Sequence, residues 1–483
     1  MNQRLLLMTA FITGAVIMIL EIAGFRAFAP YYGYSVYVWG SLIGIVLVAL
    51  STGYYFGGKL VDLKPKQELL YKLLLLSSIY ILIILFTYKS IMEFFTKTGI
   101  IYGALLSALV IFAPPMAIIS ITTPFITKLT LKKDKYGFTA GKVYSVATIG
   151  SIFGVFFSTF FLIPFYGLQV TLNTSFILIL AVSILGLSFK SKKTLFLFLL
   201  IAFLFIVPSQ TQGKAIYHQD SLYNQITIEK EEDTIILKLN NIVQTIYKKD
   251  SLFFGWYFDL YSIGPVITPV KEILHLGIGG GTVITQIQKT YPEINIDAVE
   301  IDSAIVDAAK EFFGLKQDNL NIYIDDARSF VKFNDKTYDI IQIDLFGGGI
   351  FVPYYLVTEE FYELIDKRLN PKGIIMINVL DAHPDRKILS RIETTLLEIF
   401  PSVFNIPVLH NNFVIASKKQ ITIEEIKKRL SENSIKSTPF QSVIEYSIDN
   451  IIESKKGKLK FTDDKAPIEQ LTYDMIPFLD LPG

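Results

Sequence analysis

Seven long apolar segments occupy the first 208 residues, and they constrain the fold more than any other feature of the chain. They are roughly 13 to 27 residues long, against the ~20 that a helix needs to cross the hydrocarbon core of a bilayer. Backbone N–H and C=O groups in lipid must bond within the chain, which favours helices. Residues 1–208 are therefore predicted to form a transmembrane helical domain, with spans at Leu5–Tyr31, Val38–Phe56, Leu69–Phe86, Ile100–Ile126, Val143–Phe165, Val170–Phe189 and Leu195–Val207.

Three features inside these spans predict local structure. Glu21 and Arg26 lie in the first span, where charges are costly. They either line a path for an acceptor or an ion, or they form a structural ion pair or reach towards the interface. Pro114-Pro115 predicts a kink in the fourth span. The fifth span carries small residues that predict a close helix-packing face: Ser145, Ala147, Gly150, Ser151 and Gly154.

The composition excludes several classes of function. Cysteine is absent, which rules out disulfides, thiolate nucleophiles and cysteine-ligated zinc. The four histidines, His218, His275, His383 and His410, are scattered along the chain, so no metal site is expected. The net charge of +1 at pH 7 gives no support to nucleic-acid binding.

A small β-rich domain, residues 216–262, is predicted to follow a polar linker at Pro208–Lys214. Apolar and polar residues alternate in its two strand-like stretches, and Asn240-Asn241 between strands predicts a hairpin turn. The domain is expected to end in an aromatic helix, Leu252–Ser262. The aromatic side chains of that helix either cover a ligand or fill the core.

The stretch Glu272–Asp302 predicts a strand, a glycine turn, a helix and a second strand, which together form the first half of a nucleotide-binding α/β domain. Gly277, Gly279 and Gly281 would let the backbone approach a ligand. Glu300, at the end of the second strand, is placed to accept hydrogen bonds from two ribose hydroxyls.

Two ligand classes use such a unit. The dinucleotide fingerprint requires Gly or Ala where this chain has Thr282, whereas the observed glycine spacing is typical of loops that bind S-adenosylmethionine. The remaining interpretation is an ordinary turn between a strand and a helix, with Glu300 on the surface.

The α/β domain is predicted over residues 271–420. Its third strand ends at Asp325-Asp326, and its fourth ends at Asp344 before a glycine-rich loop. Ligands of open parallel sheets bind at the carboxyl ends of the strands, so both acids are candidate site residues. A helix at Thr358–Leu369 and a fifth strand at Gly373–Val379 follow. Residues 421–483 form a C-terminal extension with an acidic turn, Thr462–Glu469 (TDDKAPIE), expected to be a solvated loop or a flap over the cleft.

Several motifs together resemble one family. SLYNQI, VEID, DDA, QID and VPYYLVTEEFYELIDKRLNPKG, spread over Ser221–Val379, resemble the spermidine synthase (polyamine aminopropyltransferase) family. The Glu-x-x-x-x-Arg pair in the first span and GGKLVD after the second are similar to the branch fused to a multi-span membrane domain. The resemblance implies a small β-domain followed by a Rossmann-like, methyltransferase-type α/β domain.

The resemblance also implies roles for individual residues. Gln244 corresponds to a donor-binding glutamine, Glu300 to the ribose-binding acid and Asp326 to the acid beside adenine. Asp344 corresponds to the acid that accepts a proton from the attacking amine, and Tyr257 to a tyrosine that contacts the acceptor. Asp381, after the fifth strand, is a further candidate for binding the acceptor amine.

Two departures from the family pattern concern the acceptor. The family usually has an aspartate at Gly280 and the sequence Asp-Ser-Ser-Asp where this chain has Asp344-Leu345-Phe346-Gly347. Two acids that hold a diamine are therefore absent, which predicts an acceptor with one amine and a less polar or bulkier body, or a relaxed polyamine range.

The resulting hypothesis is an integral-membrane aminopropyltransferase that uses decarboxylated S-adenosylmethionine, releases methylthioadenosine and needs no metal. Its expected partners are a small-molecule amine, either a polyamine or a membrane-associated amine, the lipid bilayer and, as one option, a second copy of the chain. The alternatives are an S-adenosylmethionine-dependent methyltransferase acting on a membrane-associated acceptor, and a transporter or sensor that binds a nucleoside or polyamine.

Loop charges predict a multi-pass protein of the cell membrane with a cytoplasmic N-terminus, because basic loops follow the second, fourth and sixth spans. Seven spans would place the second half of the chain outside the cell, whereas nucleoside donors are made inside. One miscounted span reconciles the two, so a cytoplasmic catalytic domain is favoured.

Overall fold

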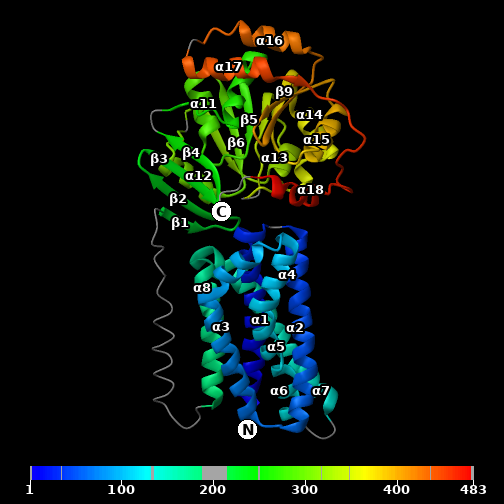
Figure 1. The fold of residues 1–483 in the computed structure, drawn as a ribbon. Coiled ribbons are helices and arrows are strands. Elements are labelled where there is room, and N and C mark those ends of the chain that lie inside the picture. Colours follow the sequence, from blue (N-terminus) through cyan, green and yellow to red (C-terminus); the bar gives the residue numbers. More distant parts are fainter. Residues whose placement is uncertain are drawn as a thin grey trace. The chain divides into compact units, whose positions relative to one another are not determined.

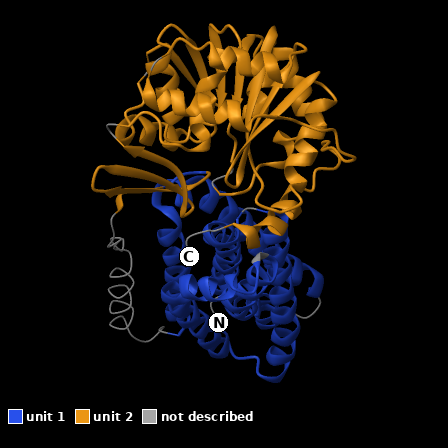
Figure 2. Ribbon diagram, turned by 45° about the horizontal axis from the view of Figure 1, so that its top comes forward, with its two compact units in different colours: residues 1–212, 220–222 blue, residues 213–219, 223–483 orange. Residues whose placement is uncertain are grey.

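The computed structural model describes residues 3–33, 35–131, 135–187, 215–248, 251–316, 318–346, 349–435 and 437–479. The chain divides into two compact units, residues 1–212 with 220–222 and residues 213–219 with 223–483 (Figure 2). The predicted seventh span, Leu195–Val207, and the predicted linker, Pro208–Lys214, lie outside the described residues.

The first unit is a bundle of long apolar helices (Figure 1). Within the described residues, four helices are long and apolar enough to cross a membrane, or up to five if a bent pair is counted as one span. The elements are α1 (Gln3–Tyr32), α2 (Val36–Leu63), α3 (Gln67–Thr96), α4 (Ile100–Ile111), α5 (Ala113–Ser120), α6 (Thr122–Thr130), α7 (Tyr136–Phe157), the π-helix η1 (Ser158–Leu162) and α8 (Ile163–Leu187).

Two breaks interrupt these helices. The expected kink at Pro114-Pro115 is confirmed, because the helix axis bends by 44° between Ile111 and Ala113. Proline has no N–H group for the helical ladder, and its ring clashes with the preceding turn. The second break is at Gly167, whose φ of 76° and ψ of 179° depart from helical geometry inside the segment 136–187. In Figure 1, α8 ends at the same end of the bundle as the N-terminus.

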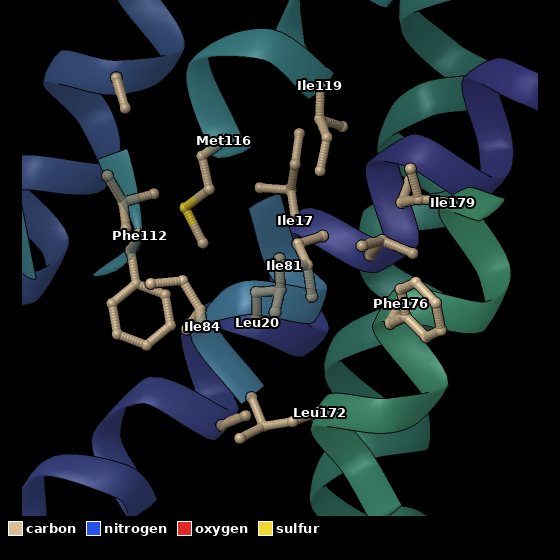
Figure 3. Close-up of a cluster of buried hydrophobic side chains, with 14 of the residues drawn as sticks. Ile17, Leu20, Ile81, Ile84, Phe112, Met116, Ile119, Leu172, Phe176 and Ile179 are labelled. Atoms are coloured by element: carbon tan, nitrogen blue, oxygen red, sulfur yellow. The ribbon is translucent and has the colours of Figure 1, made fainter. Parts of the chain in front are cut away.

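The bundle interior is packed with aliphatic and aromatic side chains from several helices. Ile17 and Leu20 of α1 meet Phe112, Met116 and Phe176 in this core (Figure 3). Elsewhere α1 and α7 approach so closely that glycine is required. A β-carbon added at Gly150 would lie 2.0 Å from the carbonyl oxygen of Phe11, and one at Gly154 would lie 2.3 Å from that of Ala15. The small-residue packing face is thus confirmed.

The second unit begins with a four-stranded antiparallel sheet in the order β1-β2-β3-β4. Its strands are β1 (Ala215–Asp220), β2 (Gln225–Glu231), β3 (Thr234–Leu239) and β4 (Ile242–Lys248). Asn240 and Asn241 join β3 to β4 with positive φ angles of 51° and 67°. Such angles are typical of a two-residue hairpin turn, so the predicted turn is confirmed.

The predicted aromatic helix at Leu252–Ser262 is wrong in its bounds and type. The structure has a 3-10 helix, η2 (Tyr257–Ile263), followed by the single turn α10 (Gly264–Ile267). The Asp259 carboxylate accepts hydrogen bonds from the N–H groups of Phe254 and Gly255, at 2.7 and 2.6 Å. These bonds hold the preceding residues in a non-helical turn, in which Gly255 has a φ of 75°.

An eight-stranded sheet forms the centre of the second unit, in the order β12-β10-β11-β9-β8-β5-β6-β7. The strands from β7 to β9 are parallel, and β10, β11 and β12 extend the sheet with antiparallel pairs. The strands are β5 (Glu272–Leu276), β6 (Asn295–Glu300), β7 (Leu320–Ile324), β8 (Tyr338–Ile343), β9 (Leu369–Leu380), β10 (Ser402–Val408), β11 (Asn411–Ser417) and β12 (Ile452–Glu453).

Helices cover both faces of this sheet, which confirms the predicted Rossmann-like class (Figure 1). The chain runs from β5 outward to β7 and then returns to place β8 on the other side of β5, so the strand order reverses between β5 and β8. The helices are α11 (Thr282–Thr290), α12 (Ser303–Phe312), α13 (Ala327–Phe333), η3 (Tyr354–Leu356), α14 (Glu359–Arg368), α15 (Lys387–Leu397), α16 (Ile423–Ser431), α17 (Thr438–Asn450), α18 (Ile468–Met475) and η4 (Ile476–Phe478).

The contact between α1 and α7 predicts that Gly150→Leu destabilises the bundle. The new side chain would meet the backbone of Phe11, and overpacking of this kind costs about 1–3 kcal/mol. Thermal unfolding in detergent should show the loss. Gly141→Leu is the matched control, because a β-carbon at Gly141 of the same helix meets nothing within 4 Å. Equal melting temperatures for the two variants would contradict the packing described here.

Candidate active site

The carboxyl ends of β5 and β8 meet at the point where the strand order reverses, which is where open α/β sheets bind ligands. Asp344 follows β8, and its N–H donates to the carbonyl of Leu276 at 3.0 Å. Gly277 follows β5 with a φ of 90°, and a β-carbon there would lie 2.2 Å from the carbonyl oxygen of Asp344. The glycine loop and the Asp344 loop are therefore in direct backbone contact.

The rest of the glycine loop leads into helix α11. Gly279 and Gly281 have φ angles of 53° and 75°, which favour glycine, and Gly281 is the N-cap of α11. The N–H of Gly280 donates to Thr245 Oγ1 of β4 at 3.0 Å. A β-carbon at Gly280 would lie only 2.6 Å from Thr245 Cγ2. Thr245 thus fills the space that a side chain at Gly280 would need.

Gln244 lies beside this contact, at an irregularity of the β3–β4 ladder. Leu237 pairs with Thr245 and Lys238 pairs with Val243, which leaves Gln244 without a partner across the strands. Such a bulge redirects the side chains next to it and is often found beside active sites. The half-buried Gln244 is therefore one residue away from the glycine loop's contact with β4.

Glu300 lies at the end of β6 and is 8% exposed. Its carboxylate accepts hydrogen bonds from the N–H groups of Ile278, at 3.0 Å, and Asp302, at 3.1 Å. Burial raises the pKa of Glu300, while these backbone hydrogen bonds lower it. The backbone of Gly279 forms a further hydrogen bond to this carboxylate. The bonds orient the carboxylate beside the glycine loop, and a carboxylate has about four acceptor sites, which leaves capacity to accept from a ribose hydroxyl.

Asp326 lies at the next strand end, after β7. The N–H of Asp325 donates to the carbonyl of Glu300 at 3.1 Å, so the two strand ends are adjacent. Asp326 caps helix α13 by accepting from the N–H of Ser329 at 2.9 Å, and it accepts from the hydroxyl of Tyr355 at 3.0 Å. The structure therefore brings the predicted ribose-side and adenine-side acids to one edge of the sheet.

Asp344 is held by two polar side chains. Asn378 Nδ2 donates to Asp344 Oδ1 at 3.0 Å, and the Tyr257 hydroxyl also bonds to this carboxylate. Burial raises the pKa of Asp344 to about 6, although both hydrogen bonds lower it. The same burial, with the nearby Asp344 charge, raises the pKa of Tyr257 well above its usual value, so the phenol stays a donor. Asp344 can take up a proton near neutral pH.

Comparison with known sequences matches residues 262–428 to the spermine/spermidine synthase domain. The second half of this chain carries a spermine/spermidine synthase domain. The match includes Glu300 and Asp344, and it leaves Gln244, Tyr257 and Tyr261 before its first residue.

Two curated relatives align with about half of this chain. The chain is 26% identical over 276 residues to a probable polyamine aminopropyl transferase of Bifidobacterium longum, covering 53% of this chain and 61% of that protein. It is 29% identical over 235 residues to a polyamine aminopropyltransferase of Vibrio vulnificus, covering 46% and 77%. The solved structure of a probable spermidine synthase from Corynebacterium glutamicum aligns with 19% identity and a TM-score of 0.39, over 52% of this chain and 98% of that one.

The second unit contains supporting residues that sequence reasoning missed. Asn411 Nδ2 donates to Asn378 Oδ1 at 2.7 Å, so the Asn378 amide is oriented with its NH₂ group towards Asp344. The Tyr261 hydroxyl donates to the carbonyl of Ile343 at 2.6 Å and accepts from the N–H of Asn378 at 3.1 Å. The available signal was a polar residue within an apolar strand, as Asn378 is in GIIMINVL.

Asp381 has a different environment from the one predicted. It is fully buried, and its carboxylate accepts from the N–H groups of His383, Ile388 and Leu389 at 2.8 to 3.1 Å. These bonds hold the start of helix α15, and they favour a structural role over binding of the acceptor amine.

Gly347 lies outside the described residues. Within the described residues, no group of three His, Asp or Glu side chains could hold a metal ion.

The backbone contact of the synthase domain predicts that Gly277→Ala destabilises the second unit more than Gly314→Ala does. Both glycines have positive φ, 90° and 71°, so both substitutions strain the backbone. Only the methyl at Gly277 meets the Asp344 carbonyl, which should add about 1–3 kcal/mol to the loss. Denaturant unfolding measures both variants. A smaller loss at Gly277 would mean that the two loops are not packed as described.

Proposed function

We propose that this chain is an integral-membrane aminopropyltransferase that transfers an aminopropyl group from decarboxylated S-adenosylmethionine to an amine. One observation carries the proposal. A half-buried carboxylate, Asp344, with a pKa raised to about 6, lies at the switch point of the synthase domain against Gly277 of the glycine loop. This is the arrangement that an amine nucleophile and a nucleoside electrophile need in order to meet.

The donor site is proposed to use the adjacent ends of β5, β6 and β7. Glu300 would accept from the ribose hydroxyls, and Asp326 would accept from the adenine amino group. Both carboxylates are already oriented by backbone N–H groups, so little reorganisation is needed on binding. Gln244, at the β4 bulge, would contact the donor from the side of the small sheet.

The proposed reaction is a single displacement. The amine nitrogen attacks the propyl carbon next to the sulfonium, a C–N bond forms, and the C–S bond breaks. Its electron pair goes to sulfur, which leaves as the neutral thioether methylthioadenosine. The attacking amine loses its proton to the Asp344 carboxylate, which Asn378 and Tyr257 orient. No metal takes part in this scheme, and the protein contributes positioning and one general base.

The surroundings of Asp344 support an acceptor with one charged amine near the reacting end. Gly280 cannot carry a carboxylate in this backbone, because Thr245 occupies the position of its β-carbon. Leu345 follows Asp344 where the family has a polar residue. A second cationic amine would lose its hydration there without gaining a partner. The acceptor is therefore proposed to have a less polar or bulkier body beyond its reacting amine. The alternative is that the enzyme accepts a broad range of polyamines.

The first unit is proposed to cross the membrane with the synthase domain on the cytoplasmic side. The helical segment of 52 residues would be ~78 Å long if straight, whereas the bilayer core is ~30 Å thick. It would therefore cross twice, with the reversal at Gly167, which raises the highest count of crossings within the described residues from five to six. The proposal takes the short predicted seventh segment, Leu195–Val207, not to cross. Six crossings then return the chain to its starting side, which the loop charges predict to be the cytoplasm.

Asp344→Asn is expected to keep methylthioadenosine binding and to lose turnover by about 10²–10⁴-fold, because the amide cannot take up a proton. Product mass spectrometry with decarboxylated S-adenosylmethionine, and in parallel with S-adenosylmethionine, tests the function and separates aminopropyl from methyl transfer. Since the base must be ionised and its pKa is about 6, wild-type kcat/KM should fall as pH drops through about 6. Near-normal turnover by the variant, or transfer from S-adenosylmethionine alone, contradicts the proposal.

Steady-state kinetics should show that putrescine is not the best acceptor. An amine with a bulkier or less polar body should have the higher kcat/KM. The double variant Thr245→Gly, Gly280→Asp should improve putrescine use, whereas Gly280→Asp alone should not, because Thr245 blocks the new side chain. A wild-type kcat/KM for putrescine of about 10⁴ M⁻¹s⁻¹ or more, above that of the other amines, would refute this specificity.

Cysteine labelling in intact cells tests the proposed side of the membrane, and the chain has no native cysteine to interfere. Ser434→Cys, at an exposed position of the second unit, should be protected from an impermeant thiol reagent until the cells are lysed. Lys64→Cys, in the loop after α2, should be protected in the same way. Thr98→Cys, in the loop after α3 at the other end of that helix, should react in intact cells. Reaction of Ser434→Cys before lysis would reverse the assignment.

A further inference from the structure

The acidic turn Thr462–Glu469 is exposed to solvent over Asp463–Lys465, as expected of a solvated loop, but it is also anchored to the rest of the second unit. Its Asp463 forms a two-pronged pair with Arg328 of α13, with Nη1 to Oδ1 at 2.7 Å and Nη2 to Oδ2 at 2.5 Å. The turn is closed by the reciprocal backbone bonds between Thr462 and Lys465. The pairing with Arg328 holds the pKa of Asp463 below its usual value, so this carboxylate is charged at neutral pH.

The same turn also binds the start of helix α14. Thr358, the N-cap of α14, donates its hydroxyl to Asp463 Oδ1 at 2.7 Å instead of capping the helix. The N–H of Asp463 donates to Glu360 at 2.9 Å, and the N–H of Glu359 donates to the carbonyl of Phe461 at 2.9 Å. Asp463 therefore links α13 and α14, two elements more than 90 residues away from it in the sequence.

A continuous set of hydrogen bonds leads from Asp463 to the proposed adenine-side acid. Arg328 Nη1 also donates to the carbonyl of Tyr355 at 3.0 Å. The hydroxyl of Tyr355 donates to Asp326 Oδ2 at 3.0 Å, and Asp326 Oδ1 caps the helix that carries Arg328. Arg328, Tyr355 and Asp326 form a closed ring through helix α13, and Asp463 is attached to this ring through Arg328. A change at Asp463 therefore alters the support of Arg328 and, through Arg328, of Tyr355.

We infer that Asp463 is a positioning residue for the donor site. It fixes Arg328, which fixes the backbone of Tyr355, which in turn orients the Asp326 carboxylate towards the adenine side of the donor. This inference rests on the proposed function, because it takes the ligand beside Asp326 to be an adenine nucleoside. Asp463 itself does not contact the donor, and it belongs to the C-terminal extension outside the matched synthase domain.

An isolated ion pair at the surface contributes little, because water screens it and both side chains lose freedom. Asp463 differs from that case in two respects. The guanidinium and carboxylate meet with two parallel bonds, a geometry that is both stronger and more specific. The pair is also one part of a connected network, in which residues affect each other's contributions. The predicted effect therefore concerns donor affinity in particular.

The test compares Asp463→Asn with Asp464→Asn in the full-length protein. Asp464 is the neighbouring exposed acid, and it makes no hydrogen bond or ion pair with the rest of the described chain, so the two variants change charge equally. Calorimetry with methylthioadenosine should show about fivefold weaker binding for Asp463→Asn, within the range of coupling inside one network. Asp464→Asn should bind like the wild type, Asp463→Glu should recover most of the affinity, and Glu300→Gln serves as the reference for a direct contact.

Kinetics separate positioning from a general structural role. Asp463→Asn should raise the KM for the donor by a similar factor and leave kcat and the KM for the acceptor unchanged. A merely structural role would lower the melting temperature and kcat together. In a double-mutant cycle, Arg328→Gln combined with Asp463→Asn should weaken binding no more than Arg328→Gln alone.

The outcomes distinguish this inference from the proposed function. If wild-type protein fails to bind methylthioadenosine, the proposed function falls and the inference falls with it. If wild-type protein binds and Asp463→Asn binds equally well, the inference alone is wrong. Additive effects of the two substitutions in the cycle would also overturn it, because Asp463 would then act through a route other than Arg328.

Discussion

The second unit depends on a backbone contact between two loops at the centre of its sheet. Gly277 and Asp344 directly follow two neighbouring parallel strands, and the absence of a side chain at Gly277 lets the Asp344 carbonyl approach. Because Asp344 N–H also bonds to Leu276, the position of the candidate base is set by the main chain. Tyr257, Asn378 and Asn411 then set its orientation and environment. Hydrophobic packing on both sheet faces holds these strands together.

Much of this arrangement could be predicted from the sequence, because it depends on local patterns. Apolar runs ending in an acid identified β6 and β8, and with them Glu300 and Asp344. Paired asparagines identified the β3–β4 turn, and small residues in the fifth span identified the face that packs on α1. In each case the residues that carry the signal also make the structure, through their φ angles, their size or their periodicity.

Features that arise between distant segments could not be predicted in this way. The bulge that leaves Gln244 unpaired becomes visible only when β3 and β4 are in register. Asp381 follows a strand end just as Asp344 does, yet the backbone of α15 takes its carboxylate. The aromatic segment was expected to be a helix from Leu252, but the Asp259 carboxylate binds the preceding N–H groups and delays the start. Each outcome depends on competition for hydrogen-bond partners, which the order of residues alone does not reveal.

The contact of Thr245 with Gly280 has a consequence for how such a site can diversify. The glycine loop is enclosed on one side by the Asp344 carbonyl and on the other by a β-strand of the small sheet, so neither Gly277 nor Gly280 has room for a side chain. Single substitutions at these two glycines would therefore lose stability before they could alter selectivity. New acceptor preferences must arise first on β4 or in the segment after Asp344, and the small sheet thereby becomes the part of the fold on which selection for a different amine can act.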